Sequence, residues 1–368
     1  MKTISLLALC LFSITSWTTP ARVLSTCNSQ LSPVTLIDQY HSRQSVPMAY
    51  SPSGNLFLTF TDHTVLSVFD STTWQVLHRF ITDVPMDRLA LSPDEMTVAV
   101  GGSRGLIEVF DISSEKLLFK GSYGKGIVDL KFTADGTKLL AGTANGTLVL
   151  NGRSIEKMQE IPNISGELIV SADGRFVSNR FPSDNRPSPL VTFDLNSMTE
   201  TFSIDSAPGS SSRWSEAFYD EYTKSLFMVE ARKIYELDPA SGRKIDDSIP
   251  GMLIGSITKM VGRPIVAIDS YTSSSNIQIY DLVLHRTIGF VDLQAGAVQG
   301  FMPDGTNLLM SSDDTVLGRS FIASTADPGK TYMIDQYAAF ESSAINPTKN
   351  QMALLLDGTI KIYDTSCL

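Results

Sequence analysis

The chain contains few of the residues that usually carry catalytic or metal chemistry. Its 368 residues include only four histidines, three cysteines and three tryptophans. No histidine has a histidine or cysteine partner at a zinc-ligand spacing, so we expect no metal site. The histidines are His41, His63, His78 and His285. There is also no Gly-x-Ser-x-Gly elbow and no Walker-type phosphate loop. The sequence therefore predicts no catalytic residue and no cofactor.

Long apolar runs are also scarce. The clearest one, residues 4–14, is shorter than the roughly 20 residues that a membrane-spanning helix needs. Lys2 precedes it and Thr19-Pro20-Ala21 follows it, which is the layout of a signal peptide. We therefore predict a signal peptide over residues 1–21, a secreted or periplasmic protein, and no membrane insertion. A lipoprotein signal at Cys10 is the alternative, but the large Leu9 precedes that cysteine.

The chain has no excess of positive charge. The chain has 39 acidic against 29 basic residues and a net charge of −10. Such a surface repels phosphate backbones and anionic lipids. We therefore expect neither nucleic acid nor a membrane surface as a partner.

What the sequence does contain is an internal repeat of about forty residues. A turn of the Ser-Pro-x-Gly type recurs at 50–54, 91–95, 132–136, 170–174 and 301–305, with weaker copies starting at 218, 260 and 345. Most turns are followed, about eighteen residues later, by an apolar residue and then aspartate. These aspartates are Asp70, Asp111, Asp194, Asp238, Asp281 and Asp364. One aspartate per copy at a fixed offset indicates a turn-capping role.

Each copy predicts four short strands. Between the turn and the aspartate lie two runs of alternating apolar residues, such as 56–60 and 64–69, and a further run follows the aspartate. A fourth run precedes the turn. Four strands per forty residues is the pattern of a β-propeller, in which each blade buries its faces against its neighbours.

Over residues 34–364 the chain resembles the WD40 and related bacterial propeller-repeat families. It differs from WD40 repeats because Phe, Tyr or Leu replaces the tryptophan of the Trp-Asp pair and no Gly-His pair occurs. The resemblance implies an all-β protein with one propeller domain over residues 22–368 and about eight four-stranded blades. Seven blades are the alternative, because the third and seventh copies are irregular; the third has Leu150-Asn151 in place of the aspartate pair.

The two ends of the chain are predicted to meet. The last copy supplies only three strands, at 342–345, 351–356 and 359–363, whereas residues 33–40 have strand composition and resemble 331–337 of the seventh copy. We expect the N-terminal strand to complete the last blade. Cys27 and Cys367 would then lie close enough for a disulfide, which stabilises by about 5 kcal/mol in the chain-entropy model. Two separate thiols are the alternative.

Three insertions predict a binding surface. They lie at 179–189, 205–214 and 269–276, and propeller strand order places all three on one face of the ring. They carry Arg180, Asn185, Arg186, Arg213, Trp214 and Tyr271. Arginine and aromatic residues are frequent in binding hot spots, and functional residues often lie on loops of a rigid scaffold. The hypothesis is a site for a partner or an anionic ligand; tolerated insertions without a role are the alternative.

These features favour a secreted, non-catalytic, monomeric propeller that binds a protein or glycan partner. The alternative is a propeller hydrolase or lactonase with its site in the central channel. Such a site uses residues scattered over several blades and leaves no local motif. Three or more carboxylates or histidines converging in the channel would favour the enzyme, and a closed apolar channel would favour the binding module.

Overall fold

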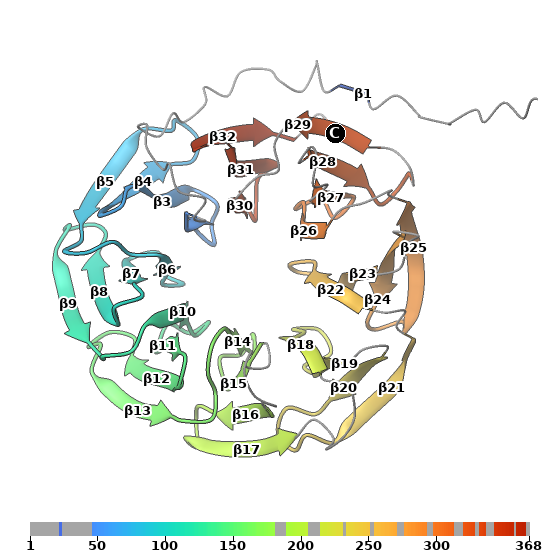
Figure 1. Cartoon of the computed structure of the whole chain (residues 1–368), viewed down its shortest axis with the longest axis horizontal. Helices are drawn as coiled ribbons and strands as arrows, with labels where there is room; N and C mark the ends of the chain where they lie inside the picture. Colours follow the sequence, from blue (N-terminus) through green and yellow to red (C-terminus); the bar gives the residue numbers. More distant parts are fainter. Residues whose placement is uncertain are drawn as a thin grey trace, which may run out of the picture.

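The computed structural model describes residues 22–23, 46–180, 189–204, 214–230, 233–250, 254–270, 276–292, 297–312, 319–327, 331–335, 342–356 and 358–365. Within these ranges the regular structure is entirely β-strand, arranged as eight sheets around a central space (Figure 1). The predicted all-β propeller with eight blades is confirmed, and the seven-bladed alternative is wrong. No helix in the described ranges is long and apolar enough to cross a membrane.

Strands within each blade run in sequence order from the centre to the rim (Figure 1). Blades 1 to 4 contain β2 (Met48–Tyr50), β3 (Leu56–Asp62), β4 (Val65–Asp70) and β5 (Val76–Ile81); β6 (Arg88–Leu91), β7 (Thr97–Gly101), β8 (Leu106–Asp111) and β9 (Leu117–Ser122); β10 (Ile127–Phe132), β11 (Lys138–Thr143), β12 (Gly146–Asn151) and β13 (Lys157–Ile161); and β14 (Leu168–Val170), β15 (Phe176–Asn179), β16 (Leu190–Asp194) and β17 (Thr199–Ile204).

Blades 5 to 8 continue the ring. They contain β18 (Trp214–Tyr219), β19 (Leu226–Glu230), β20 (Lys233–Leu237) and β21 (Lys244–Pro250); β22 (Ile254–Lys259), β23 (Ile265–Ser270), β24 (Asn276–Asp281) and β25 (Arg286–Asp292); β26 (Ala297–Phe301), β27 (Asn307–Ser312), β28 (Arg319–Ser324) and β29 (Thr331–Asp335); and β30 (Ser342–Ile345), β31 (Gln351–Leu356) and β32 (Thr359–Asp364).

The described part of blade 8 has three strands, as the sequence predicts. A short strand, β1 (Arg22–Val23), pairs in parallel with β29 at the outer edge of blade 7. Residues 33–40, the signal peptide at 1–21, Cys27 and Cys367 lie outside the described residues. Completion of blade 8, the signal peptide and the disulfide therefore remain predictions.

The strands are apolar on both sides because each blade is covered by two neighbours. In β7, Val98 and Val100 pack toward blade 1, whereas Ala99 packs toward blade 3. Phe110 stands before the repeated aspartate of blade 2, and its ring centroid lies 5.0 Å from that of Phe80 in blade 1. A phenylalanine therefore packs between blades at the position where WD40 repeats carry tryptophan.

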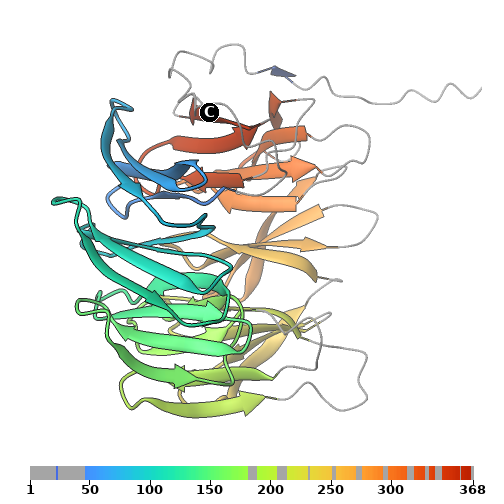
Figure 2. The ribbon, with the colours of Figure 1, turned by 60° about the vertical axis from the view of Figure 1, so that its left-hand side comes forward.

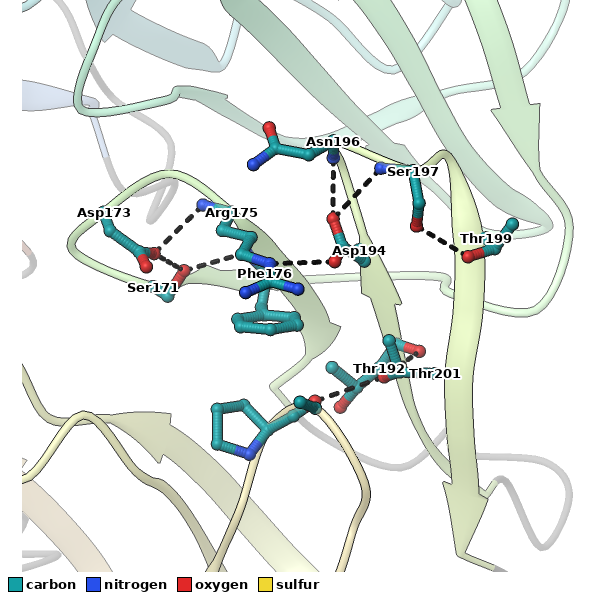
Figure 3. Close-up of polar contacts among 12 residues, drawn as sticks. Ser171, Asp173, Arg175, Phe176, Thr192, Asp194, Asn196, Ser197, Thr199 and Thr201 are labelled. Atoms are coloured by element: carbon teal, nitrogen blue, oxygen red, sulfur yellow. Dashed lines mark hydrogen bonds and ion pairs between the residues drawn. The ribbon is translucent and has the colours of Figure 1, made fainter.

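Five of the six predicted aspartates cap the turns between third and fourth strands; for Asp364 the residues that would form the turn, 366–368, lie outside the described residues. Figure 3 shows Asp194 Oδ1 accepting hydrogen bonds from the amides of Asn196 (2.8 Å) and Ser197 (3.2 Å). Asp70, Asp111, Asp238 and Asp281 make equivalent bonds. In the third copy, Asn151 Oδ1 accepts from the amides of Arg153 and Ser154, both at 2.9 Å. An asparagine oxygen replaces the carboxylate there, so blade 3 is regular in structure.

The connections divide between two faces of the ring. Because successive strands are antiparallel, the first-to-second and third-to-fourth turns share one face, which we call the turn face. The second-to-third connections and the links between blades leave from the opposite face, which we call the loop face. Figure 2 shows the ring obliquely, turned by 60° from the view of Figure 1, so that the strands are seen running between these two faces.

Candidate functional site

A cavity of about 920 Å³ occupies the middle of the ring. Its walls come from the inner strands of blades 2 to 7 and are partly apolar, with Leu130, Phe132, Ile169 and Val298 among them. The charged wall residues are Lys131, Arg180, Glu216 and Lys259. The volume lies within the range of small-molecule pockets, but what the cavity can do depends on how these charges are paired.

Arg180 and Glu216 form the ion pair nearest to the predicted binding residues. Arg180 directly follows β15, and its Nη2 and Nε lie 2.8 and 3.1 Å from Glu216 Oε1 on β18. A second carboxylate, Glu167, lies 3.4 Å from Nη1. Glu216 is buried, and its Oε2 accepts a hydrogen bond from the amide of Ile257 at 3.2 Å. Glu216 therefore connects blade 5 to both of its neighbours.

Lys259 lies near the turn-face end of β22 and is paired with blade 5. Its Nζ is 3.3 Å from Asp220 Oδ1 and also contacts Glu221. Burial lowers the pKa of the Lys259 ammonium, and the attraction of Asp220 opposes this effect. The amine thus serves as a partner for carboxylates of the adjacent blade.

Inner-strand side chains repeatedly bond the backbone of the following blade. Lys131 Nζ lies 3.0 Å from Asp129 Oδ2 and donates to the carbonyl of Leu168, while Asp129 Oδ2 accepts from the Leu168 amide at 2.9 Å. Arg88 donates to the carbonyl of Val128 in the same way. Much of the polar chemistry in the channel wall is therefore used to join blades.

The channel matches neither of the two outcomes that the sequence analysis set out. It is open and partly polar, yet among the described residues that line it Glu216 is the one carboxylate and there is no histidine. Among the described ranges, no group of three His, Cys, Asp or Glu residues is arranged to hold a metal ion. Glu216 is also engaged by Arg180 and Ile257, which leaves little capacity for general acid–base work.

The structure places the attachment points of two insertions side by side. Residues 181–188 leave directly after Arg180, and residues 205–213 lead into Trp214 at the start of β18. The carbonyl of Arg180 accepts the amide of Ala217 at 2.8 Å, which joins the two points directly. The third insertion leaves from the same face at β23 of the next blade, blade 6.

The predicted binding residues themselves are only partly described. The Arg180 side chain lies at the channel wall and is about 39% exposed. Trp214 is placed through its backbone, which pairs with Glu230. Asn185, Arg186, Arg213 and Tyr271 lie outside the described residues, so their predicted role is untested.

Sequence reasoning missed Glu216, Lys131 and Lys259. All three stand in inner strands, close before the recurring turn, at positions where a purely apolar pattern would be expected. A charged residue within such a strand is the available signal, but its partner lies in another blade 36 to 41 residues away.

Comparisons with known proteins place the chain among propellers of several kinds. No protein-family model matches it. A segment is 31% identical to subunit I of eukaryotic translation initiation factor 3 from Bombyx mori, covering 29% of this chain and 37% of that protein. The match thus spans well under half of the curated relative.

Solved structures with the same fold include a WD40 domain and an enzyme. The C-terminal WD40 domain of Sif2 aligns with a TM-score of 0.68 at 13% identity, covering 87% of this chain and 96% of that chain. BamB from Moraxella catarrhalis aligns with a TM-score of 0.64 at 12% identity, covering 91% of this chain and 99% of that chain. The dihydro-heme d1 dehydrogenase NirN aligns with a TM-score of 0.60 at 15% identity, covering 82% of this chain and 68% of that chain. The chain is thus a divergent eight-bladed propeller with the fold of WD40 and bacterial β-propeller proteins.

Proposed function

We propose that the chain is an exported, non-catalytic scaffold that binds a protein partner through the loop face of blades 4 to 6. The observation that carries this proposal is the fixed position of Arg180. Its side chain is held by Glu216 and Glu167 at the mouth of the channel, and its carbonyl is bonded to blade 5. Two Arg- and Trp-containing insertions leave from this rigid point, in the arrangement that suits loop-based recognition.

The chemistry of the channel supports binding over catalysis. Glu216, Asp220 and Asp129 each have a cationic or amide partner, so none is a free base in an open site. The fold is shared with an enzyme as well as with binding domains, so fold likeness does not decide the question. A glycan partner on the same face is the alternative occupant.

Export and the terminal disulfide belong to the same proposal. They are supported by the sequence of residues 1–21 and by the positions of Cys27 and Cys367 at opposite ends of the mature chain. Intact-mass analysis of the secreted protein should give a chain starting at Arg22 with one disulfide. A retained N-terminus or two free thiols would contradict this part.

The binding proposal is tested with two matched triple variants. Arg186, Arg213 and Trp214 changed to alanine should abolish capture of partner proteins, as measured by quantitative mass spectrometry of material bound to the immobilised protein. The control changes Arg175, Lys224 and Tyr222 to alanine, which removes two cations and one aromatic ring from the turn face of blades 4 and 5. Equal loss of the same proteins from both variants, or from neither, would overturn the proposal.

A further inference from the structure

The rim of blade 6 is apolar at a position where other blades are polar. The fourth strand of a blade lies at the rim of the ring (Figure 1), and we call it the rim strand. The ninth residue after the capping residue has the same register in blades 1 to 4 and 6, opposite the third residue before the cap. Blade 6 carries Phe290 there, and it is 47% exposed. The other four blades carry Arg79, Lys120, Glu160 and Ser203.

The turn that leads into this rim strand is apolar as well. In blades 1, 2 and 5 the third residue after the cap is a threonine or serine, whose hydroxyl bonds the capping carboxylate at 3.0, 2.8 and 2.7 Å. Blade 6 has Leu284 at this position, and it is 55% exposed. Leucine cannot make the hydroxyl bond, so blade 6 lacks a local interaction and exposes an apolar side chain instead. With its exposed neighbours, Leu284 forms the blade 6 rim patch, which consists of Val283, Leu284, Ile288 and Phe290.

The backbone edge beside this patch is open within the described residues. The sheet of blade 6 ends at β25, so the outer edge of β25 has no strand partner there. Proteins usually place charged side chains on such edges to prevent unwanted pairing. From 287 to 291, β25 has no charged residue. The rim strands of blades 1 to 5 each contain at least one, including Arg79, Lys120, Lys157, Glu200 and Lys244.

Blade 7 shows what an uncharged rim strand can accept. Its rim strand β29 has no charged residue from Thr331 to Ile334. The edge of β29 is paired with a further strand, β1, in which Val23 lies opposite Met333. Among the described rim strands, the uncharged edge of blade 7 is therefore covered, whereas that of blade 6 is open. We expect the edge of blade 6 to be covered by a strand too.

We propose that β25 pairs antiparallel with β25 of a second copy of this chain, about a two-fold axis near Gly289. The strand begins at Arg286 and ends at Asp292. Antiparallel pairing brings each arginine to the end that carries the partner's aspartate, whereas parallel pairing would bring like charges together. Between these ends an uncharged strand meets its own copy, which is the self-complementary surface that a two-fold interface requires. The second strand covers Ile288 and Phe290.

This interface leaves the loop faces of both copies open. The rim strands run between the loop face and the turn face, so pairing at their edges buries neither face. Because the two copies of β25 run in opposite directions, the two loop faces point in opposite directions. The inference is therefore independent of the partner site proposed above. A dimer also differs from the monomer that the sequence led us to expect.

Sedimentation velocity at several micromolar concentrations tests the proposal. The wild-type protein should sediment as a dimer. Phe290→Arg introduces the residue that blade 1 carries at this position and should raise the dissociation constant of the dimer at least ten-fold. Leu284→Ser, which introduces the residue of blades 2 and 5, should also weaken the dimer without lowering the melting temperature of the monomer. Leu118→Arg is the matched control, because Leu118 is 51% exposed on the rim strand of blade 2.

The control should leave the dissociation constant unchanged. Thermal unfolding of each variant, measured under conditions where it is monomeric, shows that the variants are folded. The proposal is wrong if the wild-type protein is a monomer at every concentration. It is also wrong if Phe290→Arg and Leu118→Arg have equal effects, or if Leu284→Ser dimerises like the wild type.

Charge reversal tests the antiparallel orientation. Arg286→Glu introduces the residue that blade 3 carries at this position, Glu156, and brings acidic ends together in the dimer. It should raise the dissociation constant about three-fold or more, and Asp292→Arg should act similarly. The two changes combined restore opposite charges and should return the constant to within about two-fold of the wild-type value. Single variants without effect, or a combined variant as weak as the single ones, would rule out the antiparallel pairing.

Discussion

Arg180 of blade 4 donates two hydrogen bonds to one oxygen of Glu216 in blade 5, at 2.8 and 3.1 Å. The other oxygen of Glu216 accepts from the Ile257 amide of blade 6. One buried carboxylate thereby connects three consecutive blades, at the point where the largest insertions leave the ring. The predicted binding sector is therefore a firmly joined part of the scaffold.

Replacing Glu216 should weaken this junction. In Glu216→Ala the Ile257 amide loses its acceptor and Arg180 loses its nearer carboxylate. We expect the free energy of unfolding to fall by about 1–3 kcal/mol, with the lower part of the range reflecting the partial exposure of Arg180. Chemical denaturation measures this. Glu167→Gln alters the more exposed pair, in which Glu167 Oε2 lies 3.4 Å from Arg180 Nη1, and should lower the free energy of unfolding by less than about 0.5 kcal/mol. An equal loss of stability in both variants would contradict the role of Glu216 as the residue that joins the blades.

The capping aspartates should make the ring sensitive to acid. The amide of Thr73, followed by that of Thr72, lowers the pKa of Asp70 below its ordinary value. A lowered folded-state pKa gives stability that is complete above the unfolded-state pKa of about 4 and is lost as pH falls through the folded-state value. Unfolding free energies measured between pH 5 and 2 should decline less steeply in Asp70→Asn. Identical slopes would show that this cap does not contribute.

Gly242 should tolerate no side chain, because it faces Phe202 of the preceding blade. A Cβ there would lie 2.6 Å from the Phe202 ring, and the backbone φ is +67°. Gly242→Ala should therefore destabilise more than Gly124→Ala, which has a φ of +68° but nothing within 4 Å. The second variant should cost about 1 kcal/mol from backbone strain alone. Thermal unfolding of the two single variants, and of the double variant Gly242→Ala with Phe202→Ala, separates backbone strain from the steric contact with Phe202. Equal destabilisation by Gly242→Ala and Gly124→Ala would rule out the contact.

Lys224 is a position where replacement by glycine should stabilise the fold. It is exposed and has a φ of 60°, a conformation that costs an ordinary residue about 1 kcal/mol but not glycine. Lys224→Gly should raise the free energy of unfolding by a few tenths to about 1 kcal/mol, whereas Lys224→Ala should leave it nearly unchanged. Destabilisation by glycine would mean that the lysine side chain has an unrecognised structural role.

The repeat predicts the ring well because it follows from local chemistry. Alternating apolar residues mark each strand, and the expected strands at 342–345 and 351–356 coincide with β30 and β31. The turn-capping role of Asn151 does not follow from the aspartate pattern. The turn needs an acceptor oxygen, which an asparagine side chain supplies as well as a carboxylate does. Contacts such as Glu216 with Arg180 join side chains 36 residues apart. Such pairs depend on how blades stack, which no local pattern records.

The loop face, and not the turn face, is expected to receive a partner. Lys233 and Lys224 test it directly, because both are exposed and lie toward opposite faces of blade 5. Lys233 begins β20 at the loop face, whereas Lys224 lies in the turn before β19 at the turn face. A photoreactive amino acid placed at each position in turn should, on illumination with the partner present, give covalent adducts from position 233 and none from 224. Adducts predominantly from position 224 would contradict the account.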